Sequence, residues 1–330
     1  MRNHLVRAML LIGIVLFAAG CGPNVGYVVK PVPLNEEMTE TVVAADGGLF
    51  VSNRIAIIDV DGLLMNQRQI GLLGSGENPV SAFIEKLDKA QADSRVKAVV
   101  LRINSPGGGV TAADIMYRRA KQLKADRKIP VVAIIEDVGA SGGYYLACSA
   151  DAIIAHPTAV TGSIGVLVQT VSLSGTLSKI GVDAKAITSG KFKDMGSPLK
   201  PLDVNDAALI QNIVTEFYGR FVDVVSAGRP KLAKEKVTEL ADGRVYTGQQ
   251  AVENGLVDSI GYVDDAVVLA KKLSGAQRVK VVMYHRPVGR KPNVYSSAQD
   301  MAPQMNLVNI NAPGLVNLSQ PRFLYLWAGQ

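Results

Sequence analysis

The chain has 330 residues, of which 48% are hydrophobic and 19% charged, so it is long enough to bury a sizeable core and does not have the composition of a disordered protein. Its net charge is +6, but the lysines and arginines are scattered and nowhere interleaved with aromatic residues, which argues against a nucleic-acid partner. The only cysteines are Cys21 and Cys148, too few for a disulfide framework or a structural zinc site, and we expect neither a metal nor a cofactor.

Residues 1–21 have the pattern of an export signal. Two arginines precede the apolar run 8–20, which is shorter than the roughly 20 residues that a membrane-spanning helix needs. Small residues lead directly into Cys21, and this resembles a bacterial lipoprotein signal, except that Ala18 stands where such signals usually carry Leu. The resemblance implies that Cys21 bears a lipid, with ordinary signal cleavage and an uncleaved anchor as alternatives. In each case the folded part is exported, and the lipid would hold it to a bacterial membrane on its periplasmic or extracytoplasmic side.

Residues 22–50 contain glycine, proline and an acidic patch, and we interpret them as a tether between the lipid and the fold. The elements expected next are strands at 54–61, 96–103, 130–136 and 152–155, with helices at about 78–93 and 111–125. These strands are apolar throughout and alternate with helices, which is typical of a parallel sheet covered on both faces.

Further helices are expected at 203–227, 231–241, 247–254 and 263–274, and a late strand at 278–284. The sequence therefore predicts one α/β domain over residues 51–286. Residues 287–330 are rich in proline, asparagine, glutamine and serine, and we interpret them as a tail or as an arm that packs on a neighbouring subunit.

A candidate nucleophile lies in the segment Gly139-Ala-Ser141-Gly-Gly143. It fits the G-x-S-x-G pattern, in which a tight strand-to-helix turn exposes a serine hydroxyl. The glycines permit the turn and let a substrate backbone approach closely. Such glycine-rich turns are common, so the motif alone does not establish a catalytic serine.

A catalytic serine needs a base. His156 and His285 follow Ser141 in the chain, but each also fits an ordinary strand-end or surface histidine. A lysine can act instead when its surroundings favour the neutral amine. Lys191 and Lys193 lie in a glycine-punctuated loop after an apolar, strand-like run, and on the residues alone solvated surface charges are the simpler interpretation.

Four segments in register resemble the signal peptide peptidase A family, which belongs to a larger group sharing the Clp-protease and crotonase fold. They are Asn104-Ser-Pro-Gly-Gly-Gly109, Ala140-Ser-Gly-Gly-Tyr-Tyr145 with Thr161-Gly-Ser-Ile-Gly165, Ser189-Gly-Lys-Phe-Lys-Asp194, and Ala241–Ala251 running into Gly255-Leu-Val-Asp258. Their order and spacing match from about residue 54 to 274. The resemblance implies an α/β Clp-protease/crotonase-like fold with repeated ββα units and a mostly parallel sheet flanked by helices.

Carried over residue by residue, the resemblance makes Ser141 the nucleophile and Lys193, which directly precedes an aspartate as the family's base does, the general base. Ser163 would hydrogen-bond to the lysine and orient it. The backbone N–H groups of Gly108 and Gly142 would form the oxyanion hole, whose donors stabilise the developing negative charge. Ser105 precedes a proline and is interpreted as shaping the loop.

The resemblance implies a membrane-anchored serine endopeptidase with a Ser/Lys dyad. Its substrates would be exported or membrane peptides with small or apolar side chains, such as cleaved signal peptides. It also implies ring-like self-association into a homo-oligomer, in which site residues can come from adjacent subunits. Two alternatives remain: a crotonase-like acyl-CoA enzyme on the same fold, which an export signal disfavours, and a non-catalytic scaffold lipoprotein.

Overall fold

The computed structural model describes residues 37–48, 50–67, 70–71, 74–75, 77–286 and 323–327. The predicted signal segment 1–21, with Cys21, lies outside the described residues, as does most of the segment 287–330. Within the described part, no helix is long and apolar enough to cross a bilayer.

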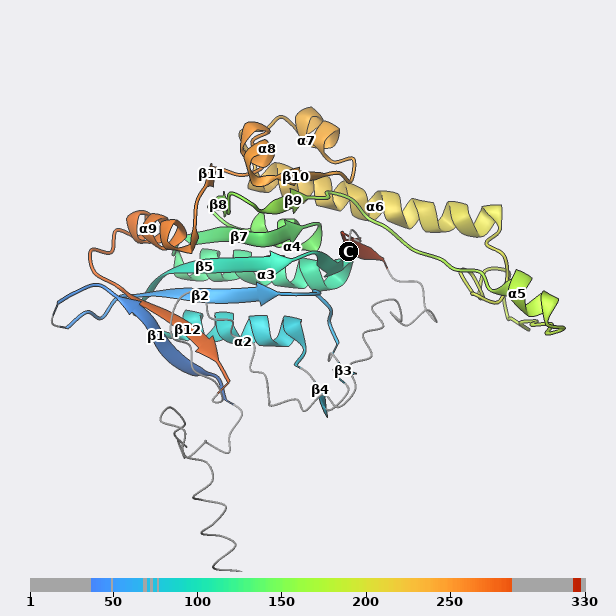
Figure 1. The fold of residues 1–330 in the computed structure, drawn as a ribbon, viewed down its shortest axis with the longest axis horizontal. Helices are drawn as coiled ribbons and strands as arrows, with labels where there is room; N and C mark the ends of the chain where they lie inside the picture. Colours follow the sequence, from blue (N-terminus) through green and yellow to red (C-terminus); the bar gives the residue numbers. More distant parts are fainter. Residues whose placement is uncertain are drawn as a thin grey trace, which may run out of the picture. The chain divides into compact units, whose positions relative to one another are not determined.

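A mostly parallel sheet runs through the described domain (Figure 1). Its strands pair in the order β1-β12-β2-β5-β7-β8-β11, while β9 pairs with the end of β7 and β10 pairs with β9. Within this sheet of the described residues, only the β1/β12 and β9/β10 pairs are antiparallel. The bounds are β1 Thr39–Ala45, β2 Arg54–Asp61, β5 Val96–Ser105, β7 Val131–Ala140, β8 Ala152–Ala155, β9 Val160–Gly162, β10 Val245–Thr247, β11 Ser259–Ile260 and β12 Lys280–His285.

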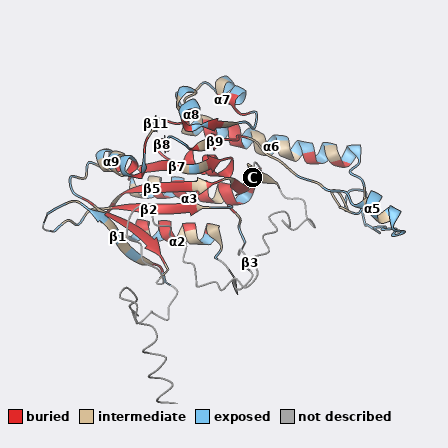
Figure 2. Ribbon diagram, in the orientation of Figure 1, coloured by how far each residue is buried: buried red, intermediate tan, exposed pale blue. Residues whose placement is uncertain are grey.

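Helices cover both faces of this sheet. On one face the core joins α2 (Pro79–Ala92), α3 (Val110–Arg127), α4 (Gly142–Ala147) and α6 (Val204–Gly228), and on the other face α9 (Val263–Ser274) packs against the strands. In β2, Ala56 and Ile58 point to the first core while Ile55 and Ile57 point to the second. Most residues of the central strands are buried (Figure 2), and the predicted mostly parallel α/β sheet is confirmed.

The remaining described elements are short. They are the hairpin β3 (Ile70–Gly71) and β4 (Gly74–Ser75), the pair β6 (Gly107–Gly109) and β13 (Leu324–Leu326), and the helices α5 (Ser174–Lys179), α7 (Lys234–Leu240) and α8 (Gly248–Glu253).

Two segments differ from the sequence predictions. Residues 39–45, placed in the tether, form β1 and pair with β12, so the tether does not extend over them. Their exposure alternates over most of the strand, as expected for an edge strand with one face toward solvent. Threonine and glutamate occupy its first three positions, so the strand does not appear in the sequence as a long apolar run. Residues 324–326, placed in the tail or subunit arm, pair with β6 of the same chain.

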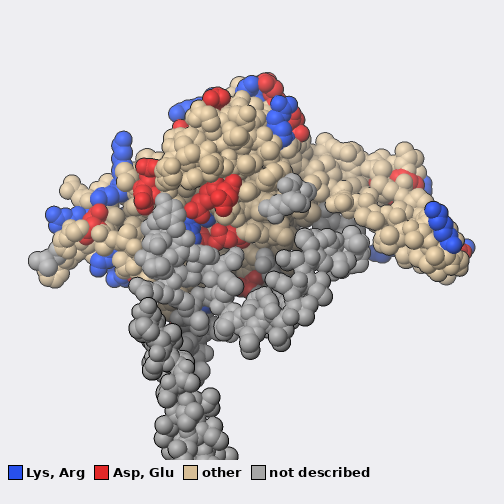
Figure 3. All heavy atoms as spheres, in the orientation of Figure 1, with Lys and Arg blue, Asp and Glu red and all other residues tan. Residues whose placement is uncertain are grey.

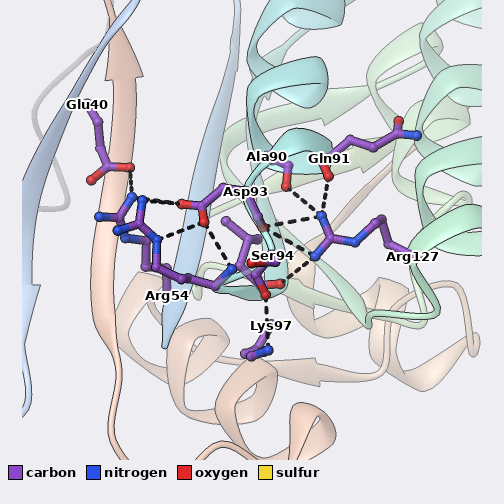
Figure 4. A network of polar contacts seen from close by, with 10 residues as sticks. Glu40, Arg54, Ala90, Gln91, Asp93, Ser94, Lys97 and Arg127 are labelled. Atoms are coloured by element: carbon purple, nitrogen blue, oxygen red, sulfur yellow. Dashed lines mark hydrogen bonds and ion pairs between the residues drawn. The ribbon is translucent and has the colours of Figure 1, made fainter. Parts of the chain in front are cut away.

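Arginine side chains join the sheet to the end of α2 (Figure 4). Arg54 on β2 donates to the Asp93 carboxylate at 2.7 Å and to Glu40 on β1. Arg127, the last residue of α3, donates to main-chain carbonyls at the end of α2, including those of Ala90 and Asp93 at 3.2 Å each. Carbonyls that α2 leaves unpaired at its C-terminus are thereby satisfied.

The candidate active site

Ser141 occupies a strained turn between β7 and α4. Its backbone has φ 51° and ψ −116°, a conformation that non-glycine residues seldom adopt. Its N–H donates to the Gly162 carbonyl at 2.8 Å, and its own carbonyl accepts from the Tyr145 N–H at 2.8 Å, so both sides of the turn are fixed. The segment thus has the strand–turn–helix geometry that the G-x-S-x-G pattern predicts.

Close packing explains the glycines around this turn. A Cβ on Gly139 would lie 2.6 Å from the Ile135 side chain, and one on Gly143 would lie 2.7 Å from the Ser105 carbonyl oxygen. Larger residues would therefore displace the turn from the strands beneath it.

The loop at the end of β5 approaches the same turn. Ser105 donates to the Gly62 carbonyl at 2.6 Å and accepts from the Gly107 N–H at 3.1 Å, which matches its interpretation as a loop-shaping residue. Gly107 has φ +100°, and a Cβ there would lie 2.6 Å from the amide nitrogen of Gly142. The Gly107–Gly109 loop, which carries Gly108, therefore contacts the segment that carries Gly142, so the two predicted oxyanion donors belong to segments in contact.

Ser163 follows β9 as Ser141 follows β7. The two strands are parallel neighbours, with Ala140 opposite Gly162, so the two serines come next in the same register. Ser163 also has a positive φ, 49°, and its N–H donates to the Arg244 carbonyl at 2.7 Å. The structure thus places Ser141 and Ser163 side by side, both buried.

Lys193 lies elsewhere. Its side chain is exposed, and it belongs to the turns that follow α5. Residues 173–204, which include α5 and these turns, form an arm that extends away from the sheet and α4 (Figure 1). Asp194 pairs with Lys200 at 2.7 Å, and Lys200 also contacts Asp206 of α6 at 2.9 Å. The expected strand-like run before the loop is absent: residues 182–188 are exposed and form no helix or strand. One chain therefore does not bring Lys193 to Ser141.

Each candidate histidine has a local partner. The His156 Nδ1 is 2.8 Å from the Thr158 hydroxyl, and its ring packs edge-on against Tyr262. The His285 Nε2 is 2.7 Å from the Thr41 hydroxyl on the edge strand β1. These contacts favour the structural interpretation of both residues.

An aromatic cluster beside Ser141 was not predicted from the sequence. Tyr145, four residues after Ser141, contacts Phe221 and Tyr325 with ring centroids 5.1 Å apart in each case. The Tyr145 hydroxyl donates to the Asp114 carboxylate at 2.6 Å, and burial with this bond raises the Tyr145 pKa. The contributing residues come from three distant parts of the chain, so no local pattern marks them.

Two other features bear on the chemistry. Cys148 is buried, and its burial raises the thiol pKa to about 12, which fits the inert thiol predicted. Among the described residues, no three histidine, cysteine or acidic side chains come together as metal ligands.

Two protein-family models match the chain. The model of peptidase family S49 matches residues 123–277, and the Clp protease model matches residues 52–192. The second match confirms the predicted Clp-protease-like α/β fold.

Three relatives illustrate the similarity. A protein of Enterococcus faecium named signal peptide peptidase SppA is 40% identical over 234 residues, which cover 71% of this chain and 67% of that protein. A protein of Synechocystis named as a protease is 41% identical over 211 residues, covering 64% of this chain and 74% of the relative. Protease 4 of Haemophilus influenzae is 36% identical over 224 residues, covering 68% of this chain and 35% of that longer protein.

Proposed function

Because the chain belongs to peptidase family S49 and is a serine protease related to SppA and protease 4, we propose that it is a membrane-anchored endopeptidase with Ser141 as nucleophile and Lys193 as general base. The observation that carries the proposal is the turn at Ser141, a positive-φ serine at a strand-to-helix junction, with the Gly107–Gly109 loop against the Gly142 amide.

The reaction follows from this arrangement. The Ser141 hydroxyl attacks the carbonyl carbon of a bound peptide and gives its proton to the neutral amine of Lys193. The N–H groups of Gly108 and Gly142 stabilise the resulting oxyanion, at about 3–4 kcal/mol per donor. Lys193 then protonates the leaving amine, and water hydrolyses the ester on Ser141. Ser163, next to Ser141, orients the lysine.

We place the two halves of the dyad on different copies of the chain. The Lys193 side chain is exposed on the arm, whereas Ser141 is buried beside the sheet. The arm also exposes apolar side chains, and on the face seen in Figure 3 most of its surface is uncharged. These exposed side chains are Leu173, Ile180, Val182, Ile187, Phe192, Leu199, Leu202 and Val204. A homo-oligomer in which each arm packs on a neighbour would bury them and supply each Ser141 with a lysine.

The substrate and the anchor follow from the family and the sequence. Signal peptide peptidase is the name that the Enterococcus relative carries, and cleaved signal peptides are the substrate class we propose. The lipoprotein-like signal ending at Cys21 would hold the enzyme at the membrane from which such peptides are released.

Peptide hydrolysis by residues 22–330 tests the proposal. We expect wild type and Lys191→Ala to cleave, and Ser141→Ala and Lys193→Ala each to lose nearly all activity, because the dyad acts as a unit. Lys191→Ala is the matched control, since it removes an equivalent charge two residues away. If both lysine variants cleave normally, the base lies elsewhere and His156 must be tested next.

A further inference from the structure

Lys193 lies in a segment of consecutive turns. Residues 189–200 form no helix or strand, and the Lys193 N–H donates to the Gly190 carbonyl at 3.0 Å. Two charged residues flank Lys193 in the chain. Lys191 lies over the Phe192 ring, with its Nζ 5.1 Å from the ring centre, and Asp194 follows Lys193 directly. A general base in such turns needs a contact with a firmer element, because proton transfer requires its amine at hydrogen-bond distance from the reacting hydroxyl.

Lys200 connects these turns to α6. Its Nζ donates to the Asp194 carboxylate at 2.7 Å and lies 2.9 Å from the carboxylate of Asp206, in the first turn of α6. Asp206 is buried, so its charge needs a cation close by, and Lys200 supplies it. Asp203 caps the helix by accepting from the N–H groups of Asn205 and Asp206, which fixes the turn that holds this pair.

Helix α6 gives the turns a firm support. It spans 25 residues, and Phe221, Val222 and Val225 near its C-terminal end are buried in the core on one face of the sheet. Lys200 therefore joins the residue after the proposed base to an element that is packed into the domain. All of these contacts lie within one chain, so they can hold the turns before a neighbouring copy is engaged.

Lys200 also neutralises the carboxylate beside the base. A carboxylate paired with the Lys193 amine would favour its protonated form, which cannot accept the proton of Ser141. Lys200 binds an oxygen of Asp194 instead. Hydrogen bonds to Asp194 and then to Asp206 raise the pKa of Lys200, so Lys200 stays charged while Lys193 works as a neutral amine.

The charges that act on Lys200 come from two elements. In the described part of the chain they are Asp194 in the turns and Asp203 and Asp206 on α6, and all three are acidic. We propose that Lys200 is a positioning residue for the general base: it anchors the turns of Lys193 to α6 and withholds the Asp194 carboxylate from the Lys193 amine. This rests on the proposed function.

Peptide hydrolysis measured across pH tests the role of Lys200. Lys200→Met should lower kcat by about 10- to 100-fold with little change in KM, because a small displacement of the base slows the chemical step. The acid limb of the kcat profile should also move up by about one pH unit, because Asp194 can then pair with the protonated Lys193 amine. Lys200→Arg keeps the charge and can reach both carboxylates, so it should restore most of the activity.

Two further variants separate the anchor from the charge. Lys200→Met combined with Asp194→Ala lacks the carboxylate, so its acid limb should return to the wild-type position while kcat stays low. Asp194→Ala alone keeps the buried pair of Lys200 and Asp206, and it provides the test if Lys200→Met does not fold. It should lower kcat without moving the acid limb to higher pH.

Lys234→Met is the matched control. Lys234 pairs with Asp223 of α6 at 2.7 Å on the exposed surface, so this variant loses a lysine that contacts the same helix. It should hydrolyse peptide as wild type does, since surface pairs contribute little.

The outcomes distinguish this inference from the proposed function. Normal hydrolysis by Lys193→Ala overturns both. An inactive Lys193→Ala together with wild-type kcat and pH dependence in Lys200→Met, or with wild-type kcat in Asp194→Ala, overturns the role of Lys200 alone. A shifted acid limb that persists in the double variant, or a loss in Lys200→Arg equal to that in Lys200→Met, also overturns it.

Discussion

The N–H of Ser141 and the carbonyl oxygen of Gly162 are joined by a hydrogen bond of 2.8 Å. This bond joins the first residue after β7 to the last residue of β9 and so extends the parallel pairing of the two strands. It fixes the turn that carries Ser141 to the turn that carries Ser163, and each serine has a positive φ. The proposed nucleophile and the residue proposed to orient its base are therefore placed by one backbone contact.

The proposed sharing of the dyad between copies predicts that two inactive variants complement each other. Co-expressed Ser141→Ala and Lys193→Ala chains should form oligomers in which some sites combine an intact serine with a neighbour's intact lysine. Random assembly gives about a quarter of wild-type activity, because each site needs one chain of each kind in the right order. Peptide hydrolysis by the co-purified mixture measures this. No activity above that of the separate variants would mean that each chain supplies its own base.

Ser163 can be tested without changing the backbone. Glycine accepts a φ of 49° readily, whereas alanine at this position removes the hydroxyl and keeps the strain. If the hydroxyl orients the lysine, Ser163→Gly and Ser163→Ala should both lower kcat by about 10- to 100-fold, which is less than the roughly 10²–10⁴-fold that a general acid or base itself contributes. The pH dependence of kcat should shift as well. Wild-type activity in Ser163→Gly would leave the residue only a role in the turn.

Asp61 should make folding pH-dependent. Burial and then the charge of Asp59 raise its pKa to about 6, with Arg102 and Lys86 acting in the opposite direction. In the unfolded chain an aspartate ionises near pH 4, so the folded protein loses stability as the pH rises from about 4 to about 6. Asp61→Asn should therefore raise the free energy of unfolding by up to about 3 kcal/mol at pH 8 and change it little at pH 4. Urea unfolding at both pH values measures the difference, and an equal effect at the two would contradict it.

The ion pair of Arg229 and Asp258 should be important for stability. The two contacts are 2.8 and 2.7 Å long, Arg229 is buried, and Asp258 also accepts from the Ile153 N–H. Asp258→Asn leaves the guanidinium without its charge partner and should cost about 2–4 kcal/mol in the free energy of unfolding.

A second aspartate provides the control for this pair. Asp242 pairs with Arg244 at the surface, where such pairs contribute at most about 1 kcal/mol, so Asp242→Asn should have little effect. Equal losses in the two variants, measured by thermal or urea unfolding, would show that burial of the pair is unimportant.

The central fold was predictable because strands buried in a parallel sheet appear in the sequence as continuous apolar runs. The apolar runs that became β2, β5, β7 and β8 are continuous in the sequence, and the helices after them begin and end within a few residues of their predicted bounds. The edge strand β1 is harder to recognise in the sequence, because about half of its side chains face solvent.

The site was predictable only in part. The motifs identified the turn at Ser141 and the glycine loop, because both depend on residues close together in the sequence. They did not reveal the aromatic cluster, whose residues Tyr145, Phe221 and Tyr325 meet only in the folded chain. The motifs also did not reveal that Lys193 lies on an arm. A glycine-rich loop has the same composition whether it lies at the edge of the sheet or far from it, so its composition does not indicate its position.

On the proposed arrangement, the position of that arm would also determine when the enzyme can act. If each Ser141 depends on another copy's lysine, an isolated chain is inert, and specific activity falls on dilution as the copies separate. A newly exported chain would then be unable to damage other proteins during transit. Proteolysis would begin only where enough copies accumulate on the same membrane, so that abundance itself would act as the switch.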